Sequence, residues 1–145
     1  MPEIRKCSLR DVPALVALNQ HVQSRYSENF FRKFIEGERK QCFIAEQDGK
    51  PVGYVVEGHK CGFPTTQSAA VLPEYRRQGI ASALMAQAIE GIKRRNPAYE
   101  RFVGRSRASN VASQKLHESL GMRVRERIPN YYEDGEEVIV YEKEI

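Results

Sequence analysis

Apolar residues recur at helical spacing in several stretches of the chain. Ile80, Leu84, Ala88 and Ile92 lie four residues apart and give one face of a long helix, which Asn96-Pro97 would end. Two shorter apolar sets lie earlier in the chain, one after Asp11, a plausible N-cap, and one before Gly37. The spacing predicts helices after position 11, over 28–35 and over 79–95, and a fourth helix from a cap at Asn110 or Ser109 to Leu120.

Short runs rich in apolar and β-branched residues lie between these helices. Asp48-Gly49 and Asp134-Gly135 have the composition of tight turns between strands. We expect strands at 4–8, 42–46, 52–57, 65–72, 101–107, 122–128 and 137–144, with a loop at 58–64. The order of strands and helices predicts an α/β (α+β) domain with a central mixed sheet.

Length and composition suit one ordinary globular domain over 1–145. Hydrophobic residues make up 41% and charged residues 29% of the 145 positions, enough apolar material for one core. Lys and Arg number 23 against 19 Asp and Glu, so the net charge is +4. This modest excess suits an anionic ligand, but it does not single out nucleic acid, which we do not expect to be required.

Three cysteines, Cys7, Cys42 and Cys61, are not spaced as metal or redox motifs. We therefore expect a reducing compartment and no disulfide framework. Cys61 as a nucleophile is one interpretation, and an inert thiol is the favoured one. No apolar run approaches the roughly 20 residues of a membrane span and no signal peptide begins the chain, so we expect a cytoplasmic protein without membrane association.

The segment 71–81, VLPEYRRQGIA, is the most informative stretch. A strand ends, the chain turns, and a helix opens at Gly79, with the small residue Ala81 two positions later. Free N–H groups at a helix N-terminus favour phosphate, and the lack of bulk lets a diphosphate approach the backbone. Arg76 and Arg77 add positive charge. The alternative is a plain strand-turn-helix junction with solvated arginines.

A second constellation follows about thirty residues later, at 109–122. Asn110 is placed to cap a helix or to bind a ligand amide, and Gly121 ends that helix. His117 lies seven residues after Asn110, about two turns along the same face. A surface or core histidine is the usual interpretation of such a residue taken alone.

Together, the two segments resemble the GNAT superfamily of N-acetyltransferases. Arg76-x-x-Gly79-x-Ala81 matches that superfamily's acetyl-CoA loop, and the run from Asn110 to Gly121-Met122 resembles its next motif. The resemblance implies a mostly antiparallel sheet with splayed central strands and about four flanking helices. It also implies acetyl-CoA as co-substrate, no metal, and direct transfer of the acetyl group to an amine without an acyl-enzyme.

Three further runs are similar to protein N-terminal acetyltransferases of the ribosomal-protein alanine and archaeal types. They are 27–30 (SENF), 107–110 (RASN) and 130–137 (NYYEDGEE). This resemblance implies protein or peptide N-termini as substrates, with ribosome or auxiliary-subunit association as an open possibility, in a monomer or homodimer. Acetylation of lysine side chains or small amines is an alternative, and an acetyl-CoA sensor with little turnover is another.

The resemblance also assigns roles to residues. The backbone of Ala69, Ala70 and Val71 would bind the pantetheine arm and the acetyl carbonyl, and Asn110 would bind the pantetheine chain. The diphosphate would lie on Arg76, Arg77, Gln78, Gly79, Ile80, Ala81 and Ser82. Glu28 would lie near the amine, and the peptide groove would be walled by Tyr26, Asn29, Phe30, Tyr131 and Tyr132.

Two positions depart from the family pattern. His117 replaces the usual tyrosine that protonates the leaving thiolate; we expect it to be the acid or to bind the sulfur, the alternative being a spectator with water as the acid. Arg105 stands where related enzymes often carry a glutamate base. With Arg123, Arg125 and Arg127 it would favour acidic peptides, although a solvated strand face is the simpler interpretation.

Overall fold

A single seven-stranded sheet forms the centre of the computed structural model, which describes residues 2–22, 25–37, 41–60 and 62–145. The strands are β1 (Glu3–Lys6), β2 (Gln41–Gln47), β3 (Lys50–Lys60), β4 (Phe63–Val71), β5 (Arg101–Arg107), β6 (Arg123–Ile128) and β7 (Val138–Glu144). Their order in the sheet is β1-β2-β3-β4-β5-β7-β6. The helices are α1 (Val12–Asn19), α2 (Glu28–Glu36), α3 (Ile80–Arg95) and α4 (Val111–Ser119), with short 3-10 turns at Leu9–Asp11 and Pro73–Tyr75.

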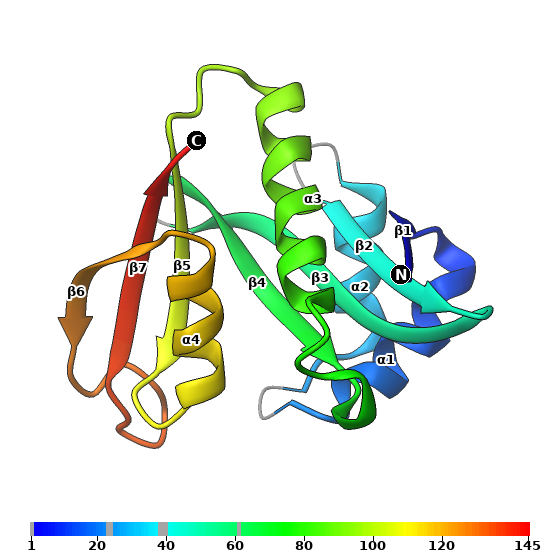
Figure 1. Cartoon of the computed structure of the whole chain (residues 1–145), viewed down its shortest axis with the longest axis horizontal. Coiled ribbons are helices and arrows are strands. Elements are labelled where there is room, and N and C mark those ends of the chain that lie inside the picture. Colours follow the sequence, from blue (N-terminus) through cyan, green and yellow to red (C-terminus); the bar gives the residue numbers. More distant parts are fainter. Residues whose placement is uncertain (1, 23–24, 38–40, 61) are drawn as a thin grey trace.

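Neighbouring strands are antiparallel except at the centre, where β4 and β5 run parallel. These two strands pair at one position, Thr65 opposite Val103, and then diverge (Figure 1). The sheet is therefore split into two wings that share one junction. The expected mixed, mostly antiparallel sheet with splayed central strands is confirmed.

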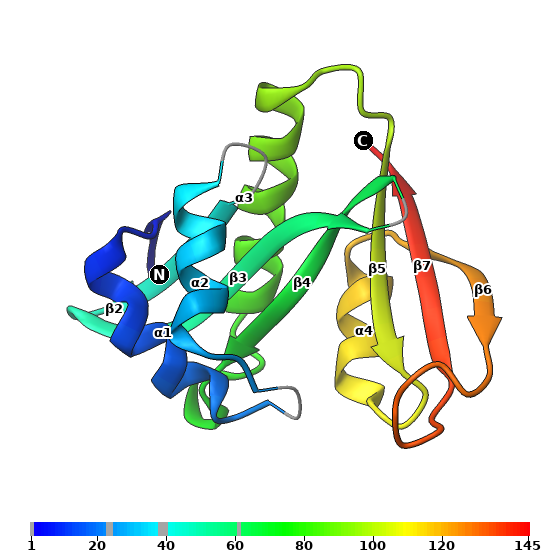
Figure 2. The same cartoon turned by 180° about the vertical axis from the view of Figure 1, so that it is seen from behind.

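Two helices cover each face of the sheet, α1 and α2 on one and α3 and α4 on the other (Figures 1 and 2). An apolar core lies on each face of the sheet, and β2 contributes to both because its successive side chains point to opposite faces. Phe43 and Ala45 pack under α3, whereas Cys42 and Ile44 pack under α1 and α2. The apolar face predicted for the third helix lies in the first of these cores.

The loop predicted over 58–64 is wrong. β3 continues to Lys60 and β4 begins at Phe63, so most of this stretch is strand. Gly58, the first residue of the predicted loop, lies within β3, where a Cβ would lie 2.8 Å from Cε1 of Phe34. Glycine within a strand commonly marks such an approach. Cys61, the candidate nucleophile, lies outside the described residues.

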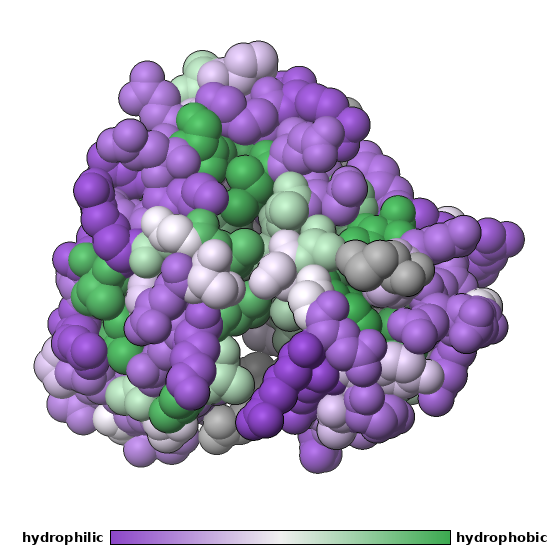
Figure 3. All heavy atoms as spheres, in the orientation of Figure 1, coloured by the Kyte–Doolittle hydropathy of each residue, from purple (hydrophilic) through white to green (hydrophobic). Residues whose placement is uncertain are grey.

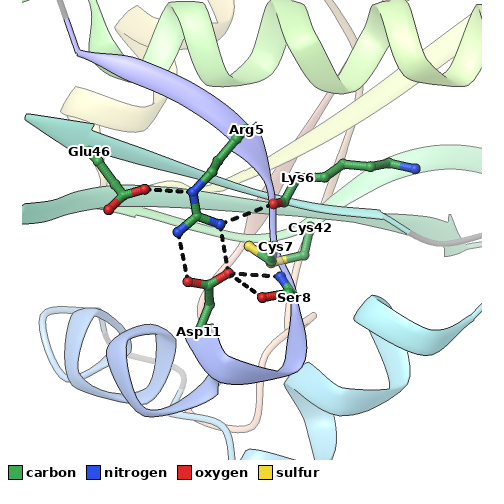
Figure 4. Close-up of polar contacts among 7 residues, drawn as sticks. All are labelled: Arg5, Lys6, Cys7, Ser8, Asp11, Cys42 and Glu46. Atoms are coloured by element: carbon green, nitrogen blue, oxygen red, sulfur yellow. Dashed lines mark hydrogen bonds and ion pairs between the residues drawn. The ribbon is translucent and has the colours of Figure 1, made fainter. Parts of the chain in front are cut away.

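Asp11 stands at the N-cap position of α1, as expected, but its side chain does not cap that helix. It accepts instead from the backbone N–H of Ser8 at 2.7 Å and from both terminal nitrogens of Arg5 at 2.8 and 2.9 Å. Arg5 Nε also donates to Glu46 at 2.6 Å, so one guanidinium ties β1 to β2 and to the start of α1 (Figure 4).

Two of the three cysteines meet across the same strand pair. The sulfurs of Cys7 and Cys42 are 3.1 Å apart, and both are free thiols (Figure 4). The contact with Cys7 and burial raise the pKa of the Cys42 thiol, which stays protonated. The spacing of the cysteines in the sequence did not indicate this contact, because the pairing of β1 with β2 creates it.

None of the helices in the described ranges is long and apolar enough to cross a membrane.

The Arg5 hydrogen bonds lower the pKa of Asp11 from 3.8 to about 2. A carboxyl whose folded-state pKa is lowered stabilises the fold above its unfolded pKa, and this stability is lost as the pH falls towards 2. We therefore expect Asp11→Asn to lower the free energy of unfolding by about 1–2 kcal/mol at pH 7 and by about half as much at pH 3.

Urea unfolding of both proteins at pH 7, 5 and 3 measures the difference. The exposed Glu36 on α2 provides the control variant, Glu36→Gln, for which no such pH-dependent loss is expected. A loss for Asp11→Asn that stays constant from pH 7 to pH 3 would contradict the assignment.

Candidate active site

A cleft of about 280 Å³ lies where β4 and β5 diverge. On the face that carries α3 and α4, apolar and weakly polar residues gather along the seam between the two wings, and the surface is hollowed there (Figure 3). The cleft draws residues from both wings and from the loops before α2 and before β7. They are Val22, Tyr26, Lys60, Thr66, Gln67, Ser68, Ala69, Arg105, Ser106, Arg107, Asn110, Ser113, Tyr131 and Tyr132.

β5 presents its residues alternately to the two faces of the sheet. Gly104 and Ser106 face α4, where both approach the imidazole of His117. Arg105 and Arg107 point to the opposite face, where they contact Thr65, Asp134 and Glu136. The cleft therefore opens on both faces of the sheet and has different chemistry on each side.

The turn before α3 has the form of an anion cradle. Arg77 and Gly79 have positive φ angles of 63° and 80°, and the first bond of the helix runs from Ala83 N–H to Gly79 C=O. In the described chain, no acceptor is found for the backbone N–H groups of 77–82. Successive free N–H groups of this kind, at the positive end of a sixteen-residue helix, bind anions.

Of the cradle's side chains, Arg76 turns inward. Its Nε donates to the carbonyl of Val71 at 3.0 Å and so fastens the turn to the end of β4. The Gln78 side chain returns to the carbonyl of Glu74 at 3.5 Å. Both residues therefore hold the shape of the turn.

The inner edge of β4 is open beside the cleft. Ala69, Ala70 and Val71 pair with β3 on one side. On the other side β5 has moved away, so the β4 backbone there has no strand partner. An extra residue, Gln67, bulges out of β4 between Thr66 and Ser68 and lines the cleft. Bulges next to active sites commonly re-aim a strand in this way.

Asn110 caps α4, as predicted. Its side-chain oxygen accepts from the N–H of Ser113 at 3.0 Å, and the residue also lines the cleft. The oxygen is thus used by the fold, and the amide nitrogen remains as the group that a ligand carbonyl would contact.

His117 is 4% exposed and does not line the cleft. Its ring stacks on Tyr141, and its Nδ1 lies 2.8 Å from the carbonyl of Ser113 and 2.9 Å from Oγ of Ser106. The carbonyl only accepts, so Nδ1 carries a proton. Burial lowers the pKa of His117, which is therefore neutral at pH 7.

Two serines stand between His117 and the cleft. Ser106 Oγ lies 2.6 Å from Ser113 Oγ, and both residues line the cleft. The single Nδ1–H is shared between the Ser113 carbonyl and Ser106 Oγ, so the Ser106 hydroxyl accepts from it and its own proton remains available to donate. Sequence reasoning missed this pair; the one local signal was Ser113, four residues before His117 on the same helix face.

Some of the residues predicted to wall a peptide groove lie in the cleft. Tyr26, Tyr131 and Tyr132 line the cleft, and the Tyr26 N–H is held by the side-chain oxygen of Asn19 at 2.6 Å. Phe30 stacks on Tyr26 behind the wall. Glu28 and Asn29 are exposed at the start of α2 and do not line the cleft.

The arginines of β6 are separate from the cleft. Arg123 pairs with Glu142 and Arg127 with Glu137, along an exposed edge strand. Arg125 lies over the ring of Phe63. This arrangement is a solvated strand face, which leaves Arg105 as the member of that predicted set that reaches the cleft.

A larger cleft of about 470 Å³ lies at the other end of α3, near Arg94 and Arg95. The smaller cleft is the better candidate, because it lies beside the edge of β4 that β5 leaves open. Within the described residues, no group of three or more His, Cys, Asp or Glu side chains is placed to hold a metal ion.

Comparison with known proteins agrees with this geometry. Residues 9–122, which contain the cradle, β5 and α4, match the model of the acetyltransferase (GNAT) family. The chain belongs to the GNAT family. Members of this family transfer an acetyl group from acetyl-CoA to an amine.

Two curated relatives cover nearly the whole chain. An N-alpha-acetyltransferase of Sulfurisphaera tokodaii is 30% identical over 92% of this chain and 87% of that protein. The [ribosomal protein bS18]-alanine N-acetyltransferase of Escherichia coli K12 is 32% identical over 94% and 93%. The crystal structure of the ribosomal-protein-S18-alanine N-acetyltransferase from Escherichia coli superposes with a TM-score of 0.83 at 31% identity, covering 100% of this chain and 94% of that one.

Because GNAT enzymes use acetyl-CoA, the role of the anion cradle can be tested by measuring acetyl-CoA binding. Gly79 and Gly49 have nearly equal φ angles of +80° and +78°, and a Cβ at either would meet nothing within 4 Å. Gly79→Ala and Gly49→Ala should each cost about 1 kcal/mol of stability from backbone strain alone. Only Gly79→Ala displaces the N–H groups of the cradle, so it alone should weaken acetyl-CoA binding, by about ten-fold or more.

Thermal unfolding and calorimetric titration with acetyl-CoA measure the two effects separately. Equal affinities in the two variants would show that the cradle does not hold the diphosphate.

Proposed function

We propose that this GNAT enzyme acetylates the N-terminal α-amine of proteins or peptides by direct transfer from acetyl-CoA. The proposal rests mainly on a cleft that opens on both faces of the sheet. The edge of β4 runs from the cleft at Ala69 to Val71, whose carbonyl accepts a hydrogen bond from Arg76 of the cradle. The other face of the cleft is bordered by Tyr26, Tyr131 and Tyr132. The names of the two relatives, both amine acetyltransferases of protein N-termini, support the same substrate class.

In this proposal the pantetheine arm lies along the open edge of β4 and takes the place of the missing strand. Backbone groups of Ala69, Ala70 and Val71 bind the arm and the acetyl carbonyl, and Asn110 binds the arm from α4. Polarisation of the carbonyl stabilises the oxyanion that forms when the amine attacks. The amine nitrogen forms a bond to the acetyl carbon, the carbon–sulfur bond breaks, and CoA leaves as its thiolate.

The acceptor must lose a proton before it attacks. An α-amine has a pKa of about 7.7–8.0, so a sizeable fraction is neutral near pH 7 and an ordered water is a sufficient base. No carboxylate lines the cleft within the described residues. Glu28, the residue first proposed to lie near the amine, would need to act through such a water from its exposed position on α2.

His117 is proposed to act on the leaving thiolate through Ser106. Because the imidazole is neutral and buried, it is a poor proton source, but its Nδ1–H orients the Ser106 hydroxyl. Ser106 can then donate to Ser113 Oγ, which leaves the Ser113 hydroxyl proton to donate a hydrogen bond to the sulfur. His117 is then a positioning residue, and the final proton comes from the solvent.

The substrate class is tested by CoA release with peptides that have a free or a blocked α-amine. Peptides with a free α-amine should support turnover, and the same peptides with a blocked α-amine and an internal lysine should not. Fragmentation mass spectrometry of the product locates the acetyl group. Acetyl on the lysine Nε alone would support the alternative, an enzyme for side-chain amines.

His117→Phe keeps an aromatic ring against Tyr141 but removes the hydrogen bond to Ser106. We expect kcat to fall by about ten-fold, which corresponds to the loss of one ordered hydrogen bond. The KM for acetyl-CoA should change little. His21→Phe, at an exposed position, is the control. An unchanged kcat for His117→Phe across pH 6–9 would eliminate the role of His117.

A further inference from the structure

The acceptor side of the cleft is positively charged. Its charged lining residues are Lys60, Arg105 and Arg107, and no Asp or Glu of the described chain lines the cleft with them. A cleft of one sign concentrates ligands of the opposite sign. What matters is which of these three charges the protein itself already neutralises.

Arg107 is neutralised. Its guanidinium donates to Asp134 at 2.9 Å and to Glu136 at 3.1 Å, and it lies 3.9 Å over the ring of Tyr132. The same Glu136 accepts from the N–H of Ser109. Arg107 therefore holds the loop before β7 against the start of α4, which is a structural task.

Lys60 is held by an aromatic ring. It donates to the hydroxyl of Tyr131 and lies 4.9 Å from the centre of that ring. It is exposed at the mouth of the cleft, so water and salt screen its charge. Lys60 contributes to the field at the entrance rather than to a defined contact.

Arg105 is different because no carboxylate pairs with it in the described chain. Its Nη1 donates to Oγ1 of Thr65 at 3.2 Å, and its Nε is buried without a hydrogen-bond partner. An unsatisfied buried donor on a charged group is costly, and native proteins keep few of them. A guanidinium with open donors matches a carboxylate, which it can bind through two oxygens.

We infer that Arg105 selects acceptors with an acidic side chain in their first two residues, by binding that carboxylate. The inference rests on the proposed function, in which the α-amine enters from the tyrosine side. β5 places Arg105 on that side and Ser106 on the cofactor side, so the anion it meets is the acceptor's and not the diphosphate.

The same charge bears on the amine. A cationic cleft repels an ammonium group and lowers the pKa of a bound amine, which favours the neutral nucleophile. An acidic side chain on the acceptor offsets this repulsion on entry. Arg105 therefore makes a carboxylate base less necessary in the cleft, at the cost of binding neutral and basic N-termini poorly.

The test compares matched peptides that have a free α-amine and differ by one charge. One pair begins with Ser-Glu or Ser-Gln, and the other begins with Asp or Asn. For the natural protein we expect kcat/KM to be about ten-fold or more higher for the acidic member, mainly through the acceptor KM. The preference should shrink as salt rises. Equal kcat/KM within both pairs would overturn the inference.

Arg105→Gln should abolish most of the preference, and Arg105→Lys, which keeps the charge, should retain part of it. Arg123→Gln is the control, since this exposed arginine pairs with Glu142 away from the cleft. The KM for acetyl-CoA in each variant reports whether the fold and cofactor site are intact. A preference that persists in Arg105→Gln would assign the selection to another residue.

These outcomes are separable from failure of the proposed function. If no peptide with a free α-amine is acetylated, the proposed function fails. If such peptides are acetylated without regard to charge, only the role of Arg105 fails.

Discussion

The single pairing between β4 and β5 is the constraint on which the rest of the molecule depends. Strands that remained paired beyond Thr65 and Val103 would close the sheet and remove the cleft. Their divergence leaves an edge of β4 with unpaired backbone groups inside the protein, an arrangement that needs a partner. The GNAT co-substrate, an extended chain with amides, has the chemistry to supply it.

The divergence also separates two kinds of chemistry on a single strand. Alternate residues of β5 point to opposite faces of the sheet, so Ser106 and Arg105 are neighbours in sequence but lie on different faces. On one face, a buried neutral histidine orders hydroxyl groups. On the other, Arg105 and Arg107 line the cleft. The charge of Arg107 is neutralised by Asp134 and Glu136, whereas no carboxylate of the described chain pairs with Arg105. Arg105 is therefore the arginine whose charge remains available in the cleft.

Prediction from sequence succeeded where local rules decide the structure. The four helices, the turn at Asp48-Gly49 and the cap at Asn110 follow from spacing and turn chemistry, and each is present. It failed where a distant residue changed the outcome. Gly58 suggested a loop, but the ring of Phe34 requires glycine within a strand at that point. Asp11 stands at the N-cap of α1 as expected, but Arg5 and Ser8 bind its carboxylate in place of a helix N–H.

The sequence by itself determined the family and the cradle, because the turn at 76–82 and the helix that follows are contiguous and need only local geometry. Tertiary structure decided everything that depends on residues far apart in the chain. The contact of Cys7 with Cys42, the serine pair in front of His117 and the exclusion of the β6 arginines from the cleft all arise from strand pairing. Side-chain direction in a strand reverses at every residue, so which face of the sheet a charge serves is known only once the register is set.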